Sequence, residues 1–555
     1  MSLTSQANVK LAAKLVLAWL FLNLVLNVDY PELSTPFQGL LRPSLDIWAL
    51  LLILSLLAVL GVAQSAWVHM LLILAVVFIR LFRFGDALIP LYFCRPFNLY
   101  IDSAFLPALI HLLYHSFSWQ LVALYGLATV AILMAFLWGI HKSFQVASKA
   151  FLIQRVRRVF WVLTGFLTVL VCFSLSGAQP FDAGFRATTC APRLMEEVAF
   201  IVKIGEIRRQ GLSAVQMAGS RIPTLTKPLA DLGNRDVYLF FIESYGETLF
   251  ANTRHAEEFA PLAQAFEAAL TQAGFSICSR FLESPTFGGS SWLAFGTLES
   301  GVWLPDQLRY NFLLSSKVSP IAAYFSQAGY RTVSVMPGTT MPWPEGGYFQ
   351  YAQTYYAKDL DYQGPSFGWS PMPDQYAISA VYTREIDRRN KPLFIRYMLT
   401  STHAPFNCQP PYLQNWNEVG NGEIYNRLQT VTFDVNWPDM RTADKAYLAS
   451  IGYDFTVLRD YLIQFVKDEA LIIILGDHQP IRQISGPGAT GLVPVHAICR
   501  KRALLDPFLR MGYTPGMVPT HAPPNNKSMQ DFLSDFLIGF SRTEANVHPE
   551  KFNGS

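Results

Sequence analysis

Residues 283–301 read ESPTFGGSSWLAFGTLESG, and the rest of the chain is best understood from this stretch. A proline turn and the glycines Gly288 and Gly289 come before Ser290 and Ser291, and an apolar run with helical spacing follows. Glycine lets a backbone bend sharply, and the free N–H groups and the dipole at a helix start favour an anion. The stretch is therefore typical of an exposed serine nucleophile, or else of an ordinary turn with a serine cap.

The composition is that of a membrane protein with a large soluble part. Of the 555 residues, 51% are hydrophobic and 15% are charged, whereas ordinary soluble proteins carry about 25% charged residues. The net charge of +3 and the lack of basic runs in the sequence give no support for nucleic-acid binding. Four of the six cysteines follow the last apolar run, where an exported domain would allow one or two disulfides.

Five apolar runs predict an N-terminal transmembrane domain of about five helices. Each run approaches the roughly 20 residues with which a helix crosses a bilayer, and they cover residues 11–28, 45–63, 67–82, 119–140 and 159–175. Basic residues precede the first run and fill the loop between the last two, and positive loops stay in the cytoplasm. Five crossings then place everything after about Gly177 outside the cytoplasm.

The remainder alternates between strand-like and helix-like segments. Buried strands are predicted at residues 236–242, 331–335, 393–399, 470–475 and 492–499. Helices are predicted between them, notably at residues 255–272, 320–328, 442–466 and 528–540. The alternation predicts an α/β sheet with helices on both faces. We therefore expect a transmembrane domain at 1–177, a juxtamembrane connector at 178–235 with a helix at 194–209, and an extracytoplasmic catalytic domain at 236–555.

Polar side chains stand at the ends of three predicted strands, which is where open α/β sheets bind ligands. Glu243 ends the first strand, Asp477 and His478 directly follow another, and His403 comes after a third. Carboxylates and imidazole suit zinc or manganese, and a metal-bound serine hydroxyl becomes a nucleophile at neutral pH. Each residue alone is also explained by a cap, a turn or a loop histidine. Together the four predict a site for one divalent metal.

With these residues in view, the soluble part resembles the alkaline-phosphatase/sulfatase superfamily. Within it, the chain is most similar to membrane-anchored lipoteichoic acid synthase-like and phosphoethanolamine transferase-like enzymes. The shared pieces are FFIES (240–244), GGSSW (288–292), STHAPF (401–406) and LGDHQP (475–480). The resemblance covers roughly residues 230–540 and the layout of apolar helices before an exported sulfatase-like domain. Its LGDH element is fairly specific, whereas a serine after a glycine turn is a weak signal alone.

The resemblance implies a role for each polar strand end. Glu243, Asp477 and His478 would hold the metal, and the nucleophile, which also touches the metal, would fall in the GGSS turn. His403 would contact the transferred phosphoryl group or protonate the leaving oxygen.

The resemblance also bears on which hydroxyl is the nucleophile. Ser290 and Ser291 both qualify, and Thr286 is a distant third. Sulfatases place the glycine of a Ser/Thr–Gly pair ten residues after the nucleophile, and Gly301 stands ten residues after Ser291, so Ser291 is preferred. Formylglycine-forming sulfatases need an arginine shortly after the nucleophile, and residues 292–295 read WLAF. This departure favours a direct hydroxyl nucleophile.

Two more residues are considered for substrate binding. Trp343, in the loop MPWPEGGYF, is predicted either to line a headgroup pocket or to pack internally. His496, in the strand VPVHAI, is predicted either as an added ligand or phosphate contact, or as a core histidine.

The function predicted from these features is a metal-dependent transferase of the bacterial inner membrane, multi-pass, with its catalytic domain in the periplasm. It would move a phosphoglycerol or phosphoethanolamine headgroup from a phospholipid to a cell-envelope glycan or lipid-linked acceptor through a covalent serine intermediate. One alternative is a hydrolase of the same fold, acting as a phosphodiesterase, phosphatase or sulfatase. Another is a non-catalytic membrane module with a sulfatase-like domain. The sequence leaves the headgroup, acceptor, metal, disulfide pairing and oligomeric state open.

Overall fold

The computed structural model describes residues 3–27, 42–107, 119–175, 189–222, 224–387, 389–435, 440, 442–466, 469–520 and 527–543. The chain divides into two compact units. One unit comprises residues 1–91 and 95–204, and the other comprises residues 92–94 and 205–555. The domain boundaries expected near Gly177 and Arg235 stay predictions.

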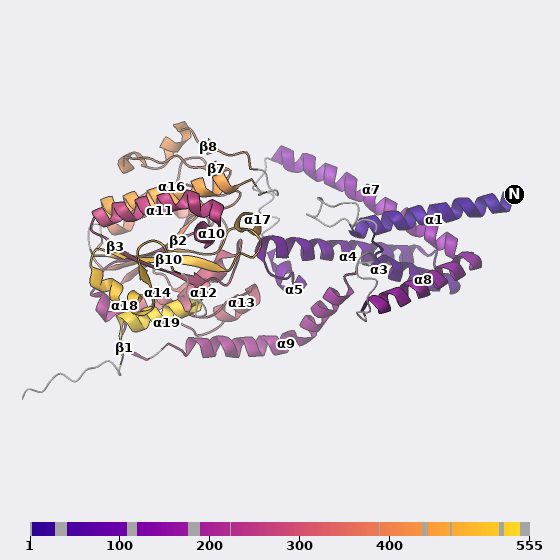
Figure 1. Ribbon diagram of the computed structural model, residues 1–555, viewed down its shortest axis with the longest axis horizontal. Helices are drawn as coiled ribbons and strands as arrows, with labels where there is room; N and C mark the ends of the chain where they lie inside the picture. The colour runs from indigo at the N-terminus through magenta and orange to yellow at the C-terminus, as the bar shows by residue number, and fades with distance from the viewer. Residues whose placement is uncertain are drawn as a thin grey trace, which may run out of the picture. The chain divides into compact units, whose positions relative to one another are not determined.

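The first unit is helical, and a helix forms at each of the five predicted spans (Figure 1). These helices are α1 (Leu3–Asn27), α3 (Leu45–Val59), α4 (Ala66–Phe93), α7 (Trp119–Phe151) and α8 (Gln154–Leu175). Among the described residues, three stretches are long and apolar enough to cross a membrane: Lys10–Asn27, Ala66–Phe93 and Ala123–Phe151. Helix α3 is apolar but shorter. The count of five crossings and their orientation stay predictions.

Apolar side chains in this unit point outward as well as inward. Leu22 and Phe144 are buried between helices, whereas Leu127 on α7 and Val162 on α8 are each 72% exposed. Soluble proteins rarely leave large contiguous apolar patches uncovered, and such patches mark contact with a membrane or a partner. The exposed apolar surface therefore agrees with a domain surrounded by lipid.

The second unit is built on a sheet of eight strands (Figure 1). In order across the sheet, they are β11 (Thr514–Pro515), β3 (Ser276–Glu283), β10 (Leu492–Cys499), β9 (Leu471–Gly476), β2 (Val237–Ile242), β6 (Leu393–Leu399), β4 (Arg331–Met336) and β5 (Gln353–Tyr356). Strands β9, β2, β6, β4 and β5 are parallel, and β10 is antiparallel to both neighbours. The predicted α/β sheet is confirmed, and it is mixed. All five predicted strands form, and β3, β5 and the short β11 are additional.

Helices cover both faces of the sheet, as expected. Helices α11 (Thr253–Gln272) and α16 (Asp444–Phe465) lie on one face, and α12 (Ser291–Ser300), α14 (Ile321–Gln327) and α19 (Met529–Phe540) lie on the other (Figure 1). Side chains of β2 alternate between the two layers. Phe240 packs against Tyr461 of α16, whereas Phe241 packs against Phe295 of α12. Burial on both faces explains why β2 is apolar throughout.

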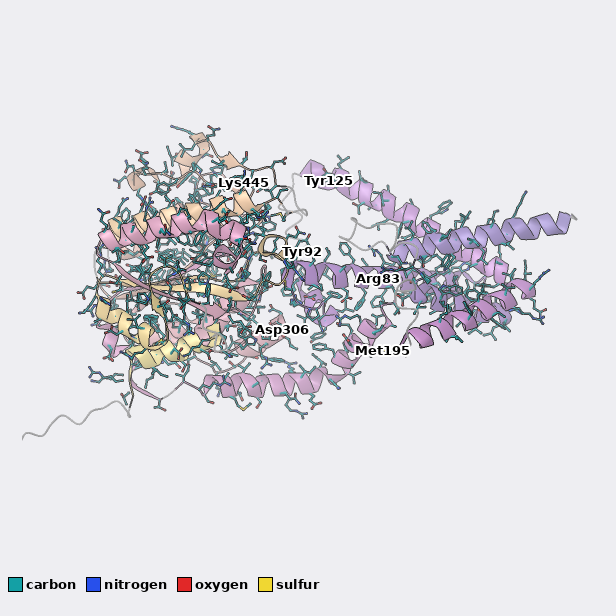
Figure 2. The ribbon with its side chains drawn as sticks, viewed as in Figure 1. Arg83, Tyr92, Tyr125, Met195, Asp306 and Lys445 are labelled. Atoms are coloured by element: carbon teal, nitrogen blue, oxygen red, sulfur yellow. The ribbon has the colours of Figure 1, made fainter. Side chains whose placement is uncertain are left out.

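Local sequence sets the start of several helices. Asp306, labelled in Figure 2, accepts the backbone N–H of Arg309 at 2.8 Å and so caps α13 (Gln307–Leu314). Ser528 and Asp531 form a reciprocal capping box at the start of α19. The helix expected at 194–209 is part of α9 (Ala191–Gly219). These starts are the part of the fold that short-range patterns determine.

The disulfides that an exported domain would allow are not formed among the described cysteines. The five cysteines whose side chains the structure describes are free thiols: Cys94, Cys190, Cys278, Cys408 and Cys499. Cys278 and Cys499 are buried in the core of the second unit. The core of this part of the chain is therefore held by packing and polar contacts.

A buried ion pair ties helix α12 to the sheet. Arg396 on β6 and Glu299 on α12 are 1% and 0% exposed, and Arg396 Nη1 lies 2.5 Å from Glu299 Oε1. Tyr351 donates its hydroxyl to the second oxygen of Glu299 at 3.0 Å, and its ring centre is 4.6 Å from the Arg396 guanidinium. Arg396 also donates to Ser334 Oγ. Each charge is compensated only while the other is present.

Arg396→Met should therefore lower the free energy of unfolding by about 3–5 kcal/mol, because Glu299 stays buried without its cation. Adding Glu299→Leu to this variant should restore much of the loss. Chemical unfolding of the full chain in detergent measures both effects. The matched control is Arg235→Met, which breaks the exposed Arg235–Glu469 pair and should change the unfolding midpoint far less. Equal losses in the buried and exposed variants would contradict this assignment.

Candidate metal and nucleophile site

The ends of two neighbouring strands bring the predicted metal ligands together. Strands β2 and β9 are parallel, and Ile242 pairs in register with Gly476. Glu243 and Asp477 directly follow the ends of these two strands and therefore emerge side by side. A Cβ on Gly476 would lie 1.7 Å from the carbonyl oxygen of Tyr245. Glycine at this position thus allows the two strand ends to approach closely.

Glu243, Asp477 and His478 form a buried group whose ligand atoms all lie within 4.8 Å of one another. His478 Nε2 is 3.1 Å from Glu243 Oε1 and 3.5 Å from Asp477 Oδ2. The other ring nitrogen, Nδ1, lies 2.8 Å from the carbonyl oxygen of Gln479. Because a carbonyl can only accept, Nδ1 carries a proton, and Nε2 faces the carboxylates. Metal-binding histidines are usually oriented in this way.

The electrostatics of this group favour an added positive charge. Burial is the largest influence on Glu243 and would raise its pKa, but the charge and hydrogen bond of His478, with smaller contributions from His403 and Asp477, together lower that pKa to about 2. At Asp477, burial and the charge of Glu243 together raise the pKa to about 8. Burial would lower the pKa of His478, but the carboxylates of Asp477 and Glu243 raise it to about 9. A divalent cation would supply the charge that a proton otherwise supplies, and two carboxylates with one imidazole fit zinc or manganese.

Ser291 joins this group at the start of α12. Its Oγ donates to Glu243 Oε2 at 3.0 Å and lies 3.3 Å from His478 Nε2. Ser290 is the residue before the helix, with a left-handed φ of 62°, and its side chain makes no capping hydrogen bond. The alternative of an ordinary serine cap at this turn is therefore contradicted. Thr286 donates its hydroxyl to the carbonyl of Gly289 within the turn.

The glycine turn is hydrogen-bonded to the segment that follows the metal ligands. Gly288 N–H donates to the carbonyl of Gln479 at 3.0 Å, and Ser284 Oγ donates to the carbonyl of Asp477 at 2.6 Å. Gly288 has a φ of +67°, and a Cβ there would lie 3.2 Å from Ile481 Cα. The turn needs glycine both for its conformation and for this close packing. Ser291 is thereby held against His478.

His403 follows β6 and contributes charge to the same site. Its Nδ1 lies 2.6 Å from the carbonyl oxygen of Ala404, which leaves Nε2 to exchange a proton with a substrate. Its charge adds to that of His478 in lowering the pKa of Glu243. The ring stacks on Trp369 with centroids 5.4 Å apart. Sequence analysis missed Trp369, which stands in a loop without any strand-end signal.

The two other substrate-binding candidates lie elsewhere in the second unit. Trp343 packs edge-on against Phe295 of α12 and stacks on Phe349, so a headgroup role for it stays a prediction. His496 is fully buried on β10, with Nε2 2.9 Å from the Tyr245 hydroxyl and Nδ1 2.6 Å from Ser279 Oγ. Both ring nitrogens are used, so the structure does not bring His496 to the metal group and places it as a core histidine.

Comparison with known families agrees with this geometry. The profile of the family described as Sulfatase matches residues 294–552. This chain carries a sulfatase-family domain. The matched region includes Asp477, His478 and His403, while Glu243 and Ser291 precede it. No curated protein matches the sequence.

Solved structures similar to the chain include a phosphoethanolamine transferase, a lipoteichoic acid synthase and a phosphoglycerol transferase. The integral membrane lipooligosaccharide phosphoethanolamine transferase A from Neisseria meningitidis is 12% identical, with a TM-score of 0.46 over 90% of this chain and 96% of its own. The lipoteichoic acid synthase LtaP from Listeria monocytogenes is 11% identical, with a TM-score of 0.38; the match covers 60% of this chain and 78% of LtaP. The phosphoglycerol transferase GacH from Streptococcus pyogenes is 12% identical, with a TM-score of 0.33; the match covers 61% of this chain and 93% of GacH.

Substitution of one of the proposed metal-ligating side chains should cost the domain its metal. Loss of a group that only hydrogen-bonds to a metal ligand weakens metal binding roughly 10- to 100-fold. His478→Ala removes a proposed ligand itself and should weaken zinc or manganese binding by more than that. The measurement is the metal content per chain after dialysis of the full protein in detergent. The matched control is His403→Ala, which should keep its metal because His403 lies outside the buried ligand group. Retention of metal by His478→Ala would contradict the ligand set.

Burial of His496 should make the domain sensitive to acid. Burial lowers its pKa from the usual 6.5 to about 3, so below pH 6.5 the unfolded chain binds a proton that the folded chain does not. Stability is therefore complete above pH 6.5 and falls as the pH falls towards 3. Between pH 6.5 and pH 5, His496 should lower the free energy of unfolding by about 2 kcal/mol. Unfolding of the wild type and His496→Asn across this range measures the difference in slope. Parallel slopes would contradict the burial of a neutral histidine.

Proposed function

We propose that this protein is a metal-dependent transferase that moves a phosphorylated headgroup from a phospholipid to an acceptor outside the cytoplasm. The observation that carries the proposal is the placement of Ser291 Oγ within 3.0 Å of Glu243 and 3.3 Å of His478. A hydroxyl at a helix start, among buried metal-ligating side chains, is suited to attack an anionic phosphorus centre.

The residues of the site divide the first step between them. Glu243, Asp477 and His478 would hold zinc or manganese, which when bound would lower the pKa of the Ser291 hydroxyl and offset charge on the phosphoryl oxygens. Ser291 Oγ attacks the lipid phosphorus, forms a new O–P bond and releases its proton to solvent. The bond from phosphorus to the diacylglycerol oxygen breaks, and His403 supplies the proton that this oxygen takes as it leaves.

The second step returns the site to its starting state. A hydroxyl of a glycan or a lipid-linked sugar attacks the same phosphorus, so that the acceptor gains an O–P bond and the Ser291 Oγ–P bond breaks. The acceptor hydroxyl gives its proton to His403, which regains the proton that it supplied in the first step. The Ser291 oxygen takes a proton back from solvent and is a hydroxyl again. Phosphoglycerol and phosphoethanolamine are the two headgroups proposed, and Trp343 is proposed to line their pocket.

The apolar helices support the choice of a lipid donor. Three stretches among the described residues are long and apolar enough to cross a membrane, and a catalytic domain tethered to a bilayer meets phospholipids at high local concentration. We propose that the helices anchor the protein in a bacterial inner membrane with the sulfatase-family domain on the periplasmic side.

Incubation with phosphatidylglycerol or phosphatidylethanolamine and zinc or manganese, without acceptor, should add one headgroup phosphate to the GGSS peptide. Peptide mass spectrometry after an early quench detects the adduct, and its mass identifies the headgroup. Ser291→Ala should abolish the adduct and retain the metal, while the matched control Ser290→Ala should keep the adduct.

Different outcomes separate the proposed transferase from its alternatives. Release of free headgroup phosphate as fast with water alone as with acceptor would show a hydrolase. An adduct that persists in Ser291→Ala and disappears in Ser290→Ala would assign the other hydroxyl. A protein that retains metal and forms no adduct with either lipid would contradict the phospholipid donor.

A further inference from the structure

A pair of buried carboxyl groups lies beneath the turn that carries His403, outside the metal ligand group. Asp374 is the first residue of α15 (Asp374–Val381), and Asp454 lies in the middle of α16, whose first turn carries Lys445 in Figure 2. Both side chains are 0% exposed. Neither forms an ion pair with any residue that the structure describes. Two adjacent carboxylates without a counter-charge are strongly unfavourable in a protein interior.

Asp374 is the member of the pair that holds the turn. Its carboxylate accepts the backbone N–H of Thr400 at 2.9 and 3.0 Å and that of Ser401 at 2.6 Å. In return, the backbone N–H of Asp374 donates to Ser401 Oγ at 3.1 Å. The turn closes when His403 N–H donates to the carbonyl of Thr400 at 3.1 Å. An ionised Asp374 thus fixes the backbone from which His403 projects.

Asp454 is bonded very differently. Among the residues that the structure describes, neither of its carboxyl oxygens has a hydrogen-bond partner, and the same holds for the neighbouring hydroxyls of Thr402 and Tyr453. The Thr402 hydroxyl faces Asp454 and favours its charged form, although without normal hydrogen-bond geometry. Asp454 therefore faces Asp374 with only the poorly placed Thr402 hydroxyl as a donor to stabilise a charge. A proton placed on Asp454 would both remove the repulsion and provide a donor.

We propose that Asp454 is a neutral carboxylic acid that donates its proton to an ionised Asp374 and thereby acts as a positioning residue for His403. Burial and the charge of Asp374 raise the pKa of Asp454 well above its usual value. Burial also raises the pKa of Asp374, but the N–H groups of Ser401 and Thr400 favour its charged form. The proton therefore belongs on Asp454. The effect on catalysis rests on the proposed function, in which His403 serves the transferred group.

A proton explains the pair better than a bound cation does. The oxygens of Asp374 already point at two backbone N–H groups, and a cation in the same place would be repelled by those donors. Calcium and magnesium also need about six oxygen ligands, whereas Asp454 and the Thr402 hydroxyl offer three free oxygens. The unequal supply of donors to the two carboxyl groups is the observation that carries the assignment.

The test compares isosteric changes of the two carboxyl groups in the full chain. In Asp454→Asn an amide N–H replaces the acid proton as donor to Asp374, so headgroup transfer should stay within about twofold of the wild type. In Asp374→Asn the charge that holds the turn is lost, so kcat should fall roughly tenfold to a hundredfold with metal content unchanged. Asp454→Leu has no hydrogen-bond donor at this position, so its kcat should fall by as much as that of Asp374→Asn.

Infrared spectroscopy tests the proton without using activity. The wild type should show carboxylic-acid C=O absorption at neutral pH that decreases by one carboxyl group in Asp454→Asn. This absorption should persist in full in the matched control Asp460→Asn, because Asp460 lies on the same helix and pairs with Arg459. This comparison holds even if Asp374→Asn fails to fold or if the transferred group is not a lipid headgroup.

Two results would overturn the proposal. One is an infrared difference spectrum in which Asp454→Asn keeps the full acid band. The other is loss of activity in Asp454→Asn equal to that in Asp374→Asn, accompanied by loss of a second divalent ion per chain, which would show a cation between the carboxylates. Absence of turnover in the wild type, with the acid band reduced only in Asp454→Asn, would count against the proposed function and leave the shared proton supported.

Discussion

The parallel pairing of β2 with β9 is the constraint on which the site depends. It sets Ile242 beside Gly476, so Glu243 and Asp477 must leave the sheet at the same point. His478 follows at once, and the hydrogen bond from Gly288 to Gln479 brings the glycine turn to the same place. Nothing in the chemistry of the individual side chains requires this proximity. It follows from register, from one glycine that allows close approach, and from one backbone hydrogen bond.

The second unit buries charge in three different ways. Arg396 and Glu299 neutralise each other directly, and their pair joins the helix that begins at Ser291 to the central sheet. Glu243, Asp477 and His478 hold an excess of negative charge that suits a divalent cation. The carboxyl pair under the His403 turn forms no ion pair with any described residue, and the proposed shared proton compensates its charge. The kind of compensation differs with the surroundings of the charge. The ion pair has a partner of opposite charge, the metal ligand group can accept a cation, and the carboxyl pair lies in a closed interior.

These charged groups also link the elements that carry the chemistry. The ion pair supports the far end of α12 while the metal ligands meet its first residue, so the helix is held at both ends. The His403 turn is held from below by Asp374 and from the side by Trp369. A site built from several strand ends needs such supports, because a displacement of about 1 Å in a reacting group can cost a hundredfold in rate.

Much of the fold could be predicted because its patterns are short-range. The apolar runs, the β2 and β10 strands and the helices α11, α16 and α19 follow from periodicity and from caps within a few residues. The strand-end rule also found Glu243, Asp477, His478 and His403. The structure brings Glu243, Asp477 and His478 into one buried group, and their roles stay predictions. Adjacent serines look alike in sequence, so the preference for Ser291 over Ser290 rested on the spacing to Gly301. The left-handed backbone of Ser290 is what points Ser291 at the ligands.

The sequence by itself determined that an apolar helical part precedes an α/β part, and which residue types gather at its strand ends. Only the tertiary structure decided that Ser291 meets Glu243, that His496 is a core residue, and that Asp374 and Asp454 face each other beneath the His403 turn. The carboxyl pair joins residues 80 positions apart, on helices whose local patterns look ordinary. Contacts of this kind depend on how elements pack over long sequence separations, and no local pattern encodes that distance.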